Sequence, residues 1–312
     1  MKNQKSILSQ EAEAFDNIVD SRLKKGFIPD IKISKSYNFF YNNPWRNEHS
    51  RKYSIDSKIK FVKKEIKKKD NVLEIGCGLG TLSYEIARTG ANITGIDISK
   101  KSIDYCNFHK NRYLGNSKKI NFLNVSLDDM IRNNENYSFD KIVFFKTLHH
   151  IPRLSKVFKS IKKIMHKNSK IIIVEPVRKN FNIENAIFSY LIRFLADTWI
   201  LKSKKFKKIS LKSIEKDIAK IYDEYKYFEK NKKQQSPLDN ISDDFEIIQK
   251  YLKINFVIEK INFEDAFKDK ILGGIRGPNL KKTISFINNF DNYLIKNKYL
   301  KGATVKIIAK YK

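Results

Sequence analysis

The sequence predicts an α/β fold with a doubly wound, mostly parallel β-sheet, and three observations lead to this prediction. Helix and strand patterns alternate regularly between residues 57 and 174. The strand candidates are short, nearly unbroken apolar runs, which is typical of parallel strands that helices cover on both faces. The 41% share of hydrophobic residues in a chain of 312 is enough to bury such a core.

The elements of this fold follow one another in order. A helix at residues 10–25 and an aromatic, polar stretch at 36–53 come first. Helices are then predicted at 57–68, 81–89, 100–112 and 154–165, and strands at 71–75, 92–96, 120–124, 139–145 and 170–174. A strand that is followed by a helix and another strand is the repeating unit of a parallel sheet, so we expect these strands to pair with one another.

The alternation stops after residue 178. Residues 179–240 show helical patterns without a strong strand, and strands at 256–261 and 303–309 and helices at 243–252 and 282–296 follow. Because strand signals resume, we interpret the helical stretch as an insertion. The predicted organisation is an N-terminal helical and aromatic cap (1–55), an α/β core (56–178), a helical insertion that forms a substrate lid (179–242) and a C-terminal part of the core (243–312).

The net charge of +29 suggests a nucleic-acid partner at first sight. However, only ten of the 63 basic residues are Arg, which is the residue that reads bases and phosphates best. The lysines are spread along the chain beside many Asn and Ile residues, whose codons are A/T-rich as well. We therefore attribute the charge to genome composition and expect no nucleic-acid partner.

Two features of the sequence indicate the cellular compartment of the protein. The two cysteines are 29 residues apart and show no disulfide pattern, which fits the reducing cytoplasm. The first residues lack the apolar run of a secretory signal, and no stretch reaches the length of a membrane span. We expect a cytoplasmic protein, with an oligomeric state that the sequence leaves open.

The most specific motif is a glycine-rich loop after the first core strand. Gly76, Gly78 and Gly80 alternate with other residues between an apolar strand and a helix. Glycines permit a sharp turn and a close approach of a ligand to the backbone. Asp97 ends the second strand, 17 residues after the last glycine, where a carboxylate accepts hydrogen bonds from a ribose diol. The pattern predicts a nucleoside-binding site.

The spacing excludes two common nucleotide sites. A dinucleotide motif requires a glycine where Thr81 or Ser83 stands, and a phosphate-binding P-loop requires a lysine that is absent here. Glu74 lies just before the first glycine, and a carboxylate there suits a cationic ligand better than a pyrophosphate. S-adenosylmethionine carries an ammonium and a sulfonium and no phosphate.

The motif Glu74-x-Gly76-x-Gly78-x-Gly80 with Asp97 resembles the class I S-adenosylmethionine-dependent methyltransferases, of the small-molecule type. Residues 139–143, 148–152 and 165–173 are similar to the family's fourth strand, the segment after it, and its fifth strand. Asn168-Ser169 replaces the usual Pro-Gly-Gly turn. The resemblance covers residues 56–178 and the two last strands, and it implies a seven-stranded Rossmann-like sheet with an antiparallel hairpin at its edge.

The resemblance also implies the cofactor contacts, residue by residue. Ser126 and Leu127 stand at the positions that hold the adenine, although the family often has an acid where Ser126 stands. Asp128 or Asp129 replaces that acid if the register shifts by one residue. Phe145 and Lys146 stand where the methionine part lies. The full set of predicted cofactor-binding residues is Glu74, Gly76, Cys77, Gly78, Gly80, Asp97, Ile98, Ser126, Leu127, Phe145 and Lys146.

His149 and His150 are the candidates for catalysis, because they follow the fourth strand at the ligand-binding edge of the sheet. In the family the first of these positions faces the substrate, so we expect His149 to be the general base and His150 to face the protein. A structural role for both rings stays open, since alignment alone supports methyl transfer. No cluster of Cys and His has metal-ligand spacing, and we expect no metal.

The parts of the chain outside the core suggest where the acceptor binds. Tyr41, Trp45 and Arg46 either line the substrate site or belong to an arm that packs on the sheet. The apolar part of the insertion, residues 186–201, either forms a lid or lies transiently on a membrane surface. In the second case Lys202, Lys204, Lys205, Lys207 and Lys208 meet anionic lipid.

The predicted function is transfer of a methyl group from S-adenosylmethionine to an oxygen or nitrogen of a small-molecule, sugar or lipid-like acceptor. The alternative is an RNA methyltransferase that uses the basic surface. Residues 144–149 lack the Asn/Asp-Pro-Pro-Tyr/Phe motif, which excludes enzymes that methylate exocyclic amines of bases. A third hypothesis, a non-catalytic module, conflicts with the intact glycine loop and Asp97.

Overall fold

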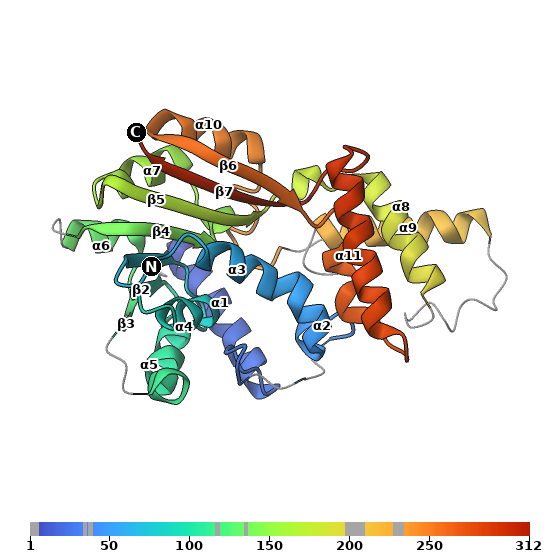
Figure 1. Ribbon diagram of the computed structural model, residues 1–312, viewed down its shortest axis with the longest axis horizontal. Coiled ribbons are helices and arrows are strands. Elements are labelled where there is room, and N and C mark those ends of the chain that lie inside the picture. Colours follow the sequence, from blue (N-terminus) through green and yellow to red (C-terminus); the bar gives the residue numbers. More distant parts are fainter. Residues whose placement is uncertain are drawn as a thin grey trace, which may run out of the picture.

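The computed structural model describes residues 6–33, 36, 40–115, 119–133, 137–196, 210–226 and 234–312. Its centre is a seven-stranded sheet in the order β3-β2-β1-β4-β5-β7-β6 (Figure 1). The strands are β1 (Asn71–Ile75), β2 (Asn92–Asp97), β3 (Ile120–Asn124), β4 (Phe139–Phe145), β5 (Met165–Pro176), β6 (Phe256–Glu264) and β7 (Thr304–Tyr311).

The pairing of the strands confirms the predicted fold class. The strands β1 to β5 are parallel to one another, and β7 runs antiparallel between β5 and the edge strand β6. Parallel strands all end at the same edge of the sheet, so the residues after β1, β2, β4 and β5 come together there. This is the edge at which the sequence placed the glycine loop, Asp97 and the two histidines.

Helices cover both faces of the sheet and make two apolar layers. One face is covered by α3 (Ser57–Lys63), α4 (Thr81–Ala87) and α5 (Lys100–Leu114). The other is covered by α6 (Leu127–Asn133), α7 (Leu154–Lys162) and α10 (Phe245–Asn255). The central strands are buried on both sides, which is why their sequences read as unbroken apolar runs.

A helical lobe extends from one end of the sheet (Figure 1). It contains α8 (Ile183–Leu195), α9 (Leu211–Lys226) and α11 (Leu280–Lys296), whose apolar faces form two further clusters. Near the N-terminus, α1 (Ile7–Lys24) lies against α5, and α2 (Glu48–Arg51) contacts α11. Among the described helices, none is both long and apolar enough to cross a membrane.

Some predicted boundaries were wrong. The helix predicted at 154–165 ends at Lys162, and β5 begins at Met165 instead of at residue 170. Met165 pairs with Phe139, and a register shift follows before Lys141 pairs with Lys170, so the irregular start of the strand hid its pattern. The helix predicted at 57–68 ends at Lys63.

The helix α6 was missed altogether, because its seven residues are too few to show a clear period. Several predicted features lie outside the described residues, namely residues 197–201 of the apolar stretch and the lysines at 202–208. The division of the chain into a cap, a core, an insertion and a C-terminal part stays a prediction.

Candidate active site

The glycine loop leaves β1 and enters α4 in the predicted place. Gly76, Gly78 and Gly80 all have positive φ angles (+72°, +52° and +79°), which side-chain-bearing residues rarely adopt. A Cβ atom at Gly76 would lie 2.2 Å from Cγ2 of Thr147, so the loop passes close to the segment after β4. A Cβ at Gly78 would meet no protein atom within 4 Å. The loop is therefore open at its middle glycine.

Asp97 is held beside this open position. One carboxylate oxygen of Asp97 accepts a hydrogen bond from the backbone N–H of Gly78 (2.8 Å), and the other accepts one from Ser99 (2.8 Å). Burial raises the pKa of Asp97, although these two bonds favour the charged form. A carboxylate oxygen can accept more than one hydrogen bond, so the geometry leaves Asp97 able to bind a ribose hydroxyl.

Glu74 points from β1 toward α4 and is almost completely buried. Its carboxyl group is hydrogen-bonded to the Ser83 hydroxyl. Burial raises the pKa of Glu74 to about 8, and Asp97 adds to the rise by repulsion, whereas the bond to Ser83 opposes it. A cationic ligand in the loop would lower this pKa and favour the carboxylate, as expected for a ligand with an ammonium group. The open loop, Asp97 and Glu74 together fit S-adenosylmethionine.

Four other predicted cofactor residues, Cys77, Ile98, Phe145 and Lys146, differ in their contacts and burial. The thiol of Cys77 is buried, and its backbone N–H donates to Ile96 (3.0 Å), which ties the loop to β2. The backbone oxygen of Ile98 accepts a bond from Asn124 (3.0 Å). Phe145 packs against the apolar layer, and Lys146 is exposed with a positive φ angle. These four residues lie at the carboxyl edge of the sheet.

The residues predicted to contact the adenine, Ser126 and Leu127, are engaged within the protein. The Ser126 hydroxyl donates to Asp129 (2.6 Å) and accepts from its backbone N–H, so these two residues together cap α6. The Leu127 side chain is buried in the core, and Asp128 pairs with Lys156 (2.6 Å). Side-chain contacts to an adenine therefore require these groups to exchange partners, and their role stays a prediction.

His149 is paired with a carboxylate that the sequence analysis did not select. Its ring Nδ1 lies 2.7 Å from Oε2 of Glu175, which ends the apolar part of β5. The other oxygen of Glu175 accepts hydrogen bonds from the backbone N–H groups of Thr147 (2.6 Å) and Leu148 (2.7 Å). The carboxylate is completely buried, so it fixes both the turn after β4 and the orientation of the ring.

The two members of this pair have shifted pKa values. Burial lowers the pKa of His149 well below 6.5, and the positive charges of His150 and Arg178 act in the same direction. Burial raises the pKa of Glu175 to about 7, and its backbone hydrogen bonds oppose the rise. His149 is thus a neutral imidazole at pH 7. When the Nδ1–H group donates its hydrogen bond to the Glu175 carboxylate, Nε2 carries no proton and can act as a base.

His150 is held by the N-terminal helix. Its Nδ1 lies 3.0 Å from Oε1 of Glu11 in α1, and its ring contacts Phe15 edge-on. Glu11 also accepts bonds from the Ser236 hydroxyl (2.7 Å) and the Leu238 backbone N–H (2.8 Å). These contacts connect α1, the turn after β4 and residues 236–238 above the histidines.

The two histidine rings lie close together, and the expectation that His149 faces the substrate and His150 the protein stays a prediction. Their centroids are 4.1 Å apart, because Leu148–His150 forms a tight 3₁₀ turn in which successive side chains are not on opposite faces. Both rings lie near Asp239, whose Oδ1 is 4.0 Å from Nε2 of His149.

The histidines and Asp239 are also the described side chains best placed for a metal. One donor atom from each of His149, His150 and Asp239 lies within 4.8 Å of the others. Arg178 already pairs with Asp239 (3.1 Å), and we assign no ion to the group. Metal-free chemistry stays a prediction, which a chelator tests directly.

The three predicted substrate residues contact a different part of the chain. Arg46 donates hydrogen bonds to the carbonyl oxygens of Gly273 (3.2 Å) and Ile275, and the guanidinium of Arg276 lies over the Tyr41 ring (4.2 Å). Trp45 is buried against Phe27. These contacts are those of a packed arm, so a role in acceptor binding stays a prediction.

Four functional candidates were missed at the sequence level: Glu11, Glu175, Arg178 and Asp239. Glu175 could have been found from the sequence. It is an acid at the end of an apolar strand, at the ligand-binding edge of the sheet, and the same feature led us to select Asp97. Glu11 and Asp239 come from segments far from the core motifs, and Arg178 follows the end of β5 directly, but nothing in the local sequence of these three marks them.

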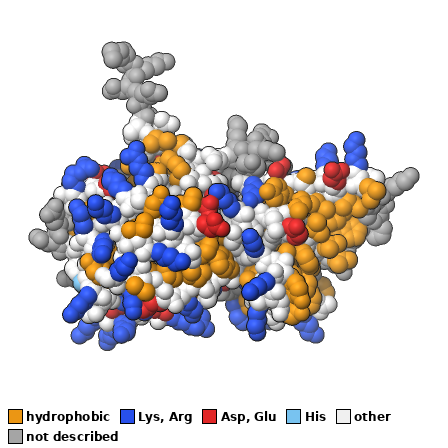
Figure 2. All heavy atoms as spheres, turned by 90° about the horizontal axis from the view of Figure 1, so that it is seen from above, with side chains coloured by type: hydrophobic (Ala, Val, Ile, Leu, Met, Phe, Trp, Pro, Cys, Tyr) orange, Lys and Arg blue, Asp and Glu red, His pale blue; other side chains and the backbone are white. Residues whose placement is uncertain are grey.

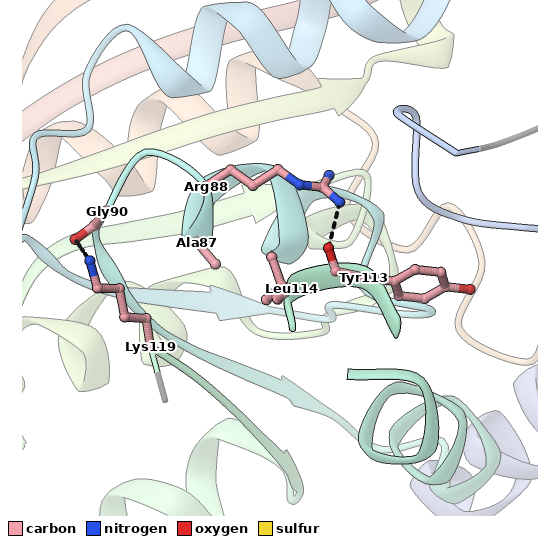
Figure 3. Close-up of a pocket in the computed structure, with 6 residues that line it drawn as sticks. All are labelled: Ala87, Arg88, Gly90, Tyr113, Leu114 and Lys119. Atoms are coloured by element: carbon pink, nitrogen blue, oxygen red, sulfur yellow. Dashed lines mark hydrogen bonds between the residues drawn. The ribbon is translucent and has the colours of Figure 1, made fainter. Parts of the chain in front are cut away.

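A cavity of about 340 Å³ lies at the opposite edge of the sheet (Figure 3). It is lined by Ala87, Arg88, Gly90, Tyr113, Leu114 and Lys119. Arg88 donates to the backbone oxygen of Tyr113 (2.8 Å), and Lys119 donates to that of Gly90 (3.4 Å). Gly90 and Lys119 precede β2 and β3, so this cavity is remote from the glycine loop and is not part of the site.

Sequence comparison places the site in a known family. A family model described as a methyltransferase domain matches residues 66–229. A ubiquinone biosynthesis O-methyltransferase of Pelagibacter ubique is 30% identical over 198 residues, which are 63% of this chain and 74% of that protein. The enzyme of the same name from Colwellia psychrerythraea is 28% identical over 47% of this chain, and the chain covers about half (53%) of its length.

Solved structures agree on the fold. The geranyl diphosphate C-methyltransferase of Streptomyces coelicolor, solved with S-adenosyl-L-homocysteine, aligns over the whole of both chains with a TM-score of 0.54 and 9% identity. The cyclopropane synthase MmaA2 of Mycobacterium tuberculosis aligns over 99% of this chain and 100% of its own, with a TM-score of 0.52 and 13% identity. With the family match and the geometry of the loop, these findings show that the chain belongs to the methyltransferase-domain family and is a class I S-adenosylmethionine-dependent methyltransferase.

Proposed function

We propose that the enzyme methylates a hydroxyl oxygen of a small molecule, with His149 as the general base and Glu175 as its positioning residue. One observation carries this proposal: the buried Glu175 carboxylate binds Nδ1 of His149 and leaves Nε2 free at the ligand-binding edge of the sheet. A hydroxyl is a poor nucleophile until its proton is removed, so a base in this position has a chemical purpose.

The residues of the loop have the complementary task of holding the cofactor. Asp97 would bind the ribose hydroxyls, Gly78 would let the nucleoside lie against the backbone, and Glu74 would face the cationic part. When bound, S-adenosylmethionine supplies an activated methyl group on a sulfonium. The chain itself has to align the acceptor with that group and to take up one proton.

The protonation states of His149 and Glu175 suit these two roles. Burial keeps His149 neutral, so its Nε2 accepts the acceptor's proton without first losing one of its own. The resulting imidazolium is stabilised by the Glu175 carboxylate at 2.7 Å. Asp239, at 4.0 Å from Nε2, lies on the side that the acceptor hydroxyl would approach.

Relatives support an oxygen acceptor. Those reported above are named as ubiquinone biosynthesis O-methyltransferases, so a quinone precursor is the first acceptor class to test. Sugar and lipid-like hydroxyls remain in the test panel, whereas no comparison favours RNA. Residues 236–242 close over the histidines through Ser236, Leu238 and Ser242, which supports a substrate lid at the end of the predicted insertion.

The test joins product analysis to a pH profile. The purified enzyme is incubated with S-adenosylmethionine and hydroxyl acceptors from each class, and mass spectrometry locates the new methyl group. We expect kcat/KM to rise with pH through about 7, because the Glu175–His149 pair must give up its extra proton before Nε2 can act as a base.

The matched variant is Glu175→Gln, which keeps the shape and removes the charge. We expect a slower enzyme whose pH limb moves to lower pH, since only His149, with its lowered pKa, remains to titrate. An unchanged profile would remove Glu175 from the mechanism. Methylation of nitrogen or of RNA alone would reject the proposed acceptor.

A further inference from the structure

Arg46 and Arg276 bring two guanidinium groups to the same backbone oxygen. Nε of Arg46 donates to the carbonyl oxygen of Gly273 (3.2 Å), and Nη1 of Arg276 donates to the same oxygen (3.0 Å). Arg46 also donates to the carbonyl of Ile275, and Nη2 of Arg276 donates to that of Tyr41 (2.9 Å). Two like charges are therefore held next to each other, where the N-terminal arm meets the segment before α11.

Neither guanidinium has a carboxylate partner among the described residues. Both side chains donate to backbone carbonyl oxygens only. The acids that are closest to Arg46 in the sequence have other partners: Oε1 of Glu48 lies 3.3 Å from Nε2 of His49, and Oδ1 of Asp56 lies 3.5 Å from Nε of Arg51. The described part of the chain thus leaves the positive charge of the pair unbalanced.

The start of α11 adds positive charge close to this pair in the sequence. The helix begins four residues after Arg276, and its first turn contains no acid. Instead, Lys281 and Lys282 are exposed there. The N-terminus of a helix carries a partial positive charge and normally favours acids in this place. Lysines at this position are unfavourable unless an anion is near.

The pair also keeps hydrogen-bond donors for a ligand. A guanidinium offers more N–H groups than these carbonyls use. Among the described residues, Nη1 of Arg46 and Nε of Arg276 have no acceptor. Both side chains are half-buried, and burial lowers the pKa of each, while the charge of Arg276 adds to the lowering at Arg46. Two partly desolvated like charges are unfavourable until an anion joins them.

Exposed charge alone does not distinguish this place from the rest of the surface. Figure 2 shows Lys and Arg side chains spread over the face in view, in keeping with the net charge of +29. The arginine pair differs because backbone oxygens fix both side chains at one point. We propose that Arg46 and Arg276 form a binding site for one oxyanion, a phosphate or carboxylate group of a small molecule.

Phosphate and carboxylate are the groups that suit two converging guanidiniums, because these planar cations form charge-assisted hydrogen bonds with their oxygens. One pair of fixed donors fits one such group, whereas a nucleic acid is held by phosphate contacts along its backbone. Arg46 is among the residues predicted to contact the acceptor, and Arg276 is a partner that the sequence did not select. The inference does not depend on the proposed acceptor or on His149, because anion binding is measured without turnover.

The test is a calorimetric titration of the full chain with inorganic phosphate and, separately, with acetate, in which chloride keeps the ionic strength at about 0.15 M. We expect at least one of the two anions to bind with a Kd of about 1 mM, and the tighter one identifies the group. Arg276→Gln should bind it at least tenfold more weakly, because one guanidinium of the pair is lost. The matched control is Arg112→Gln, exposed in the last turn of α5, which should bind like the parent.

A second variant separates anion binding from a purely structural role. Arg46→Lys keeps the charge but loses the planar group, and we expect it to weaken anion binding by at least threefold. The melting temperature in chloride shows whether each variant is folded. A lower melting temperature with unchanged anion affinity would overturn the proposal, because the pair would then only hold the loop. So would an equal loss in Arg112→Gln, no binding of either anion, or binding of an RNA oligonucleotide alone.

Discussion

The proposed site has two halves that are built in opposite ways: the glycine loop with Asp97 for the cofactor, and the two histidines with their partners for the acceptor. The cofactor half uses consecutive elements: the hydrogen bond from Gly78 to Asp97 joins residues only 19 apart. The acceptor half joins distant segments: Ser236 and Glu11, which meet above His150, are 225 residues apart. The first half is a local motif on a rigid sheet edge, whereas the second exists only after the whole chain has folded.

This difference predicts how the two halves respond to substitution. Changes in the loop should alter cofactor affinity and leave the rest of the site intact. Changes around the histidines should alter turnover or stability and leave cofactor affinity almost unchanged. Each variant below changes a residue of one half of the site or a contact that stabilises the fold around it.

The largest effect should come from the acceptor half. His149→Ala removes the proposed general base, and we expect turnover to fall by about 10²–10⁴. Affinity for S-adenosylmethionine should hardly change, because His149 contacts Glu175 and not the glycine loop. The measurement is a steady-state assay with the identified acceptor.

The same assay with and without EDTA tests the metal-free chemistry. Activity that survives EDTA agrees with His149 as a base, whereas loss of activity would reassign His149, His150 and Asp239 to a metal. Full activity in His149→Ala would leave alignment of the acceptor as the whole of the mechanism.

The next effect concerns a buried ion pair that connects the core to the C-terminal segment. Nζ of Lys58 in α3 lies 2.8 Å from Oδ2 of Asp265, and both side chains are buried. Burial disfavours the charged form of Asp265, but the Lys58 ammonium outweighs it and holds the pKa of Asp265 below its usual range. Lys58→Met should lower the free energy of unfolding by about 3–5 kcal/mol, measured by urea denaturation.

The double variant Lys58→Met/Asp265→Asn is the control for this pair. It should recover part of the loss, because Asp265 no longer carries a buried charge that Lys58 would balance; recovery is only partial, since the buried Lys268 also loses the Asp265 carboxylate, 3.7 Å away. In the parent, the stabilisation by Asp265 is present above the unfolded pKa near 3.8 and is lost as the pH falls through the lower folded value. A loss below about 1 kcal/mol in Lys58→Met would show that the pair does not hold the two parts together.

A smaller effect is expected at His150. His150→Ala removes the partner of Glu11 but leaves Glu11 bonded to Ser236 and Leu238. We expect a loss of about 1–2 kcal/mol in the free energy of unfolding. Turnover should fall less than in His149→Ala; an equal fall would make both rings part of the catalytic site.

The comparison also explains what the sequence could predict. The strands, the glycine loop and Asp97 were accessible because apolar runs and glycine spacing are local signals. The Glu11–His150 and Asp239–Arg178 contacts were not, since each joins segments whose proximity depends on the path of the chain. The close approach of the two histidine rings was not predicted for a local reason, as the turn Leu148–His150 has no distinctive composition.

The most direct test of this account is a calorimetric titration of S-adenosylmethionine into the parent enzyme, Asp97→Ala and His149→Ala. The account predicts that Asp97→Ala weakens binding at least tenfold, about 1.4 kcal/mol, because the ribose hydroxyls lose their acceptor. His149→Ala should bind within about twofold of the parent. Unchanged affinity in Asp97→Ala, or an equal loss in both variants, would contradict the separation of the cofactor half from the acceptor half.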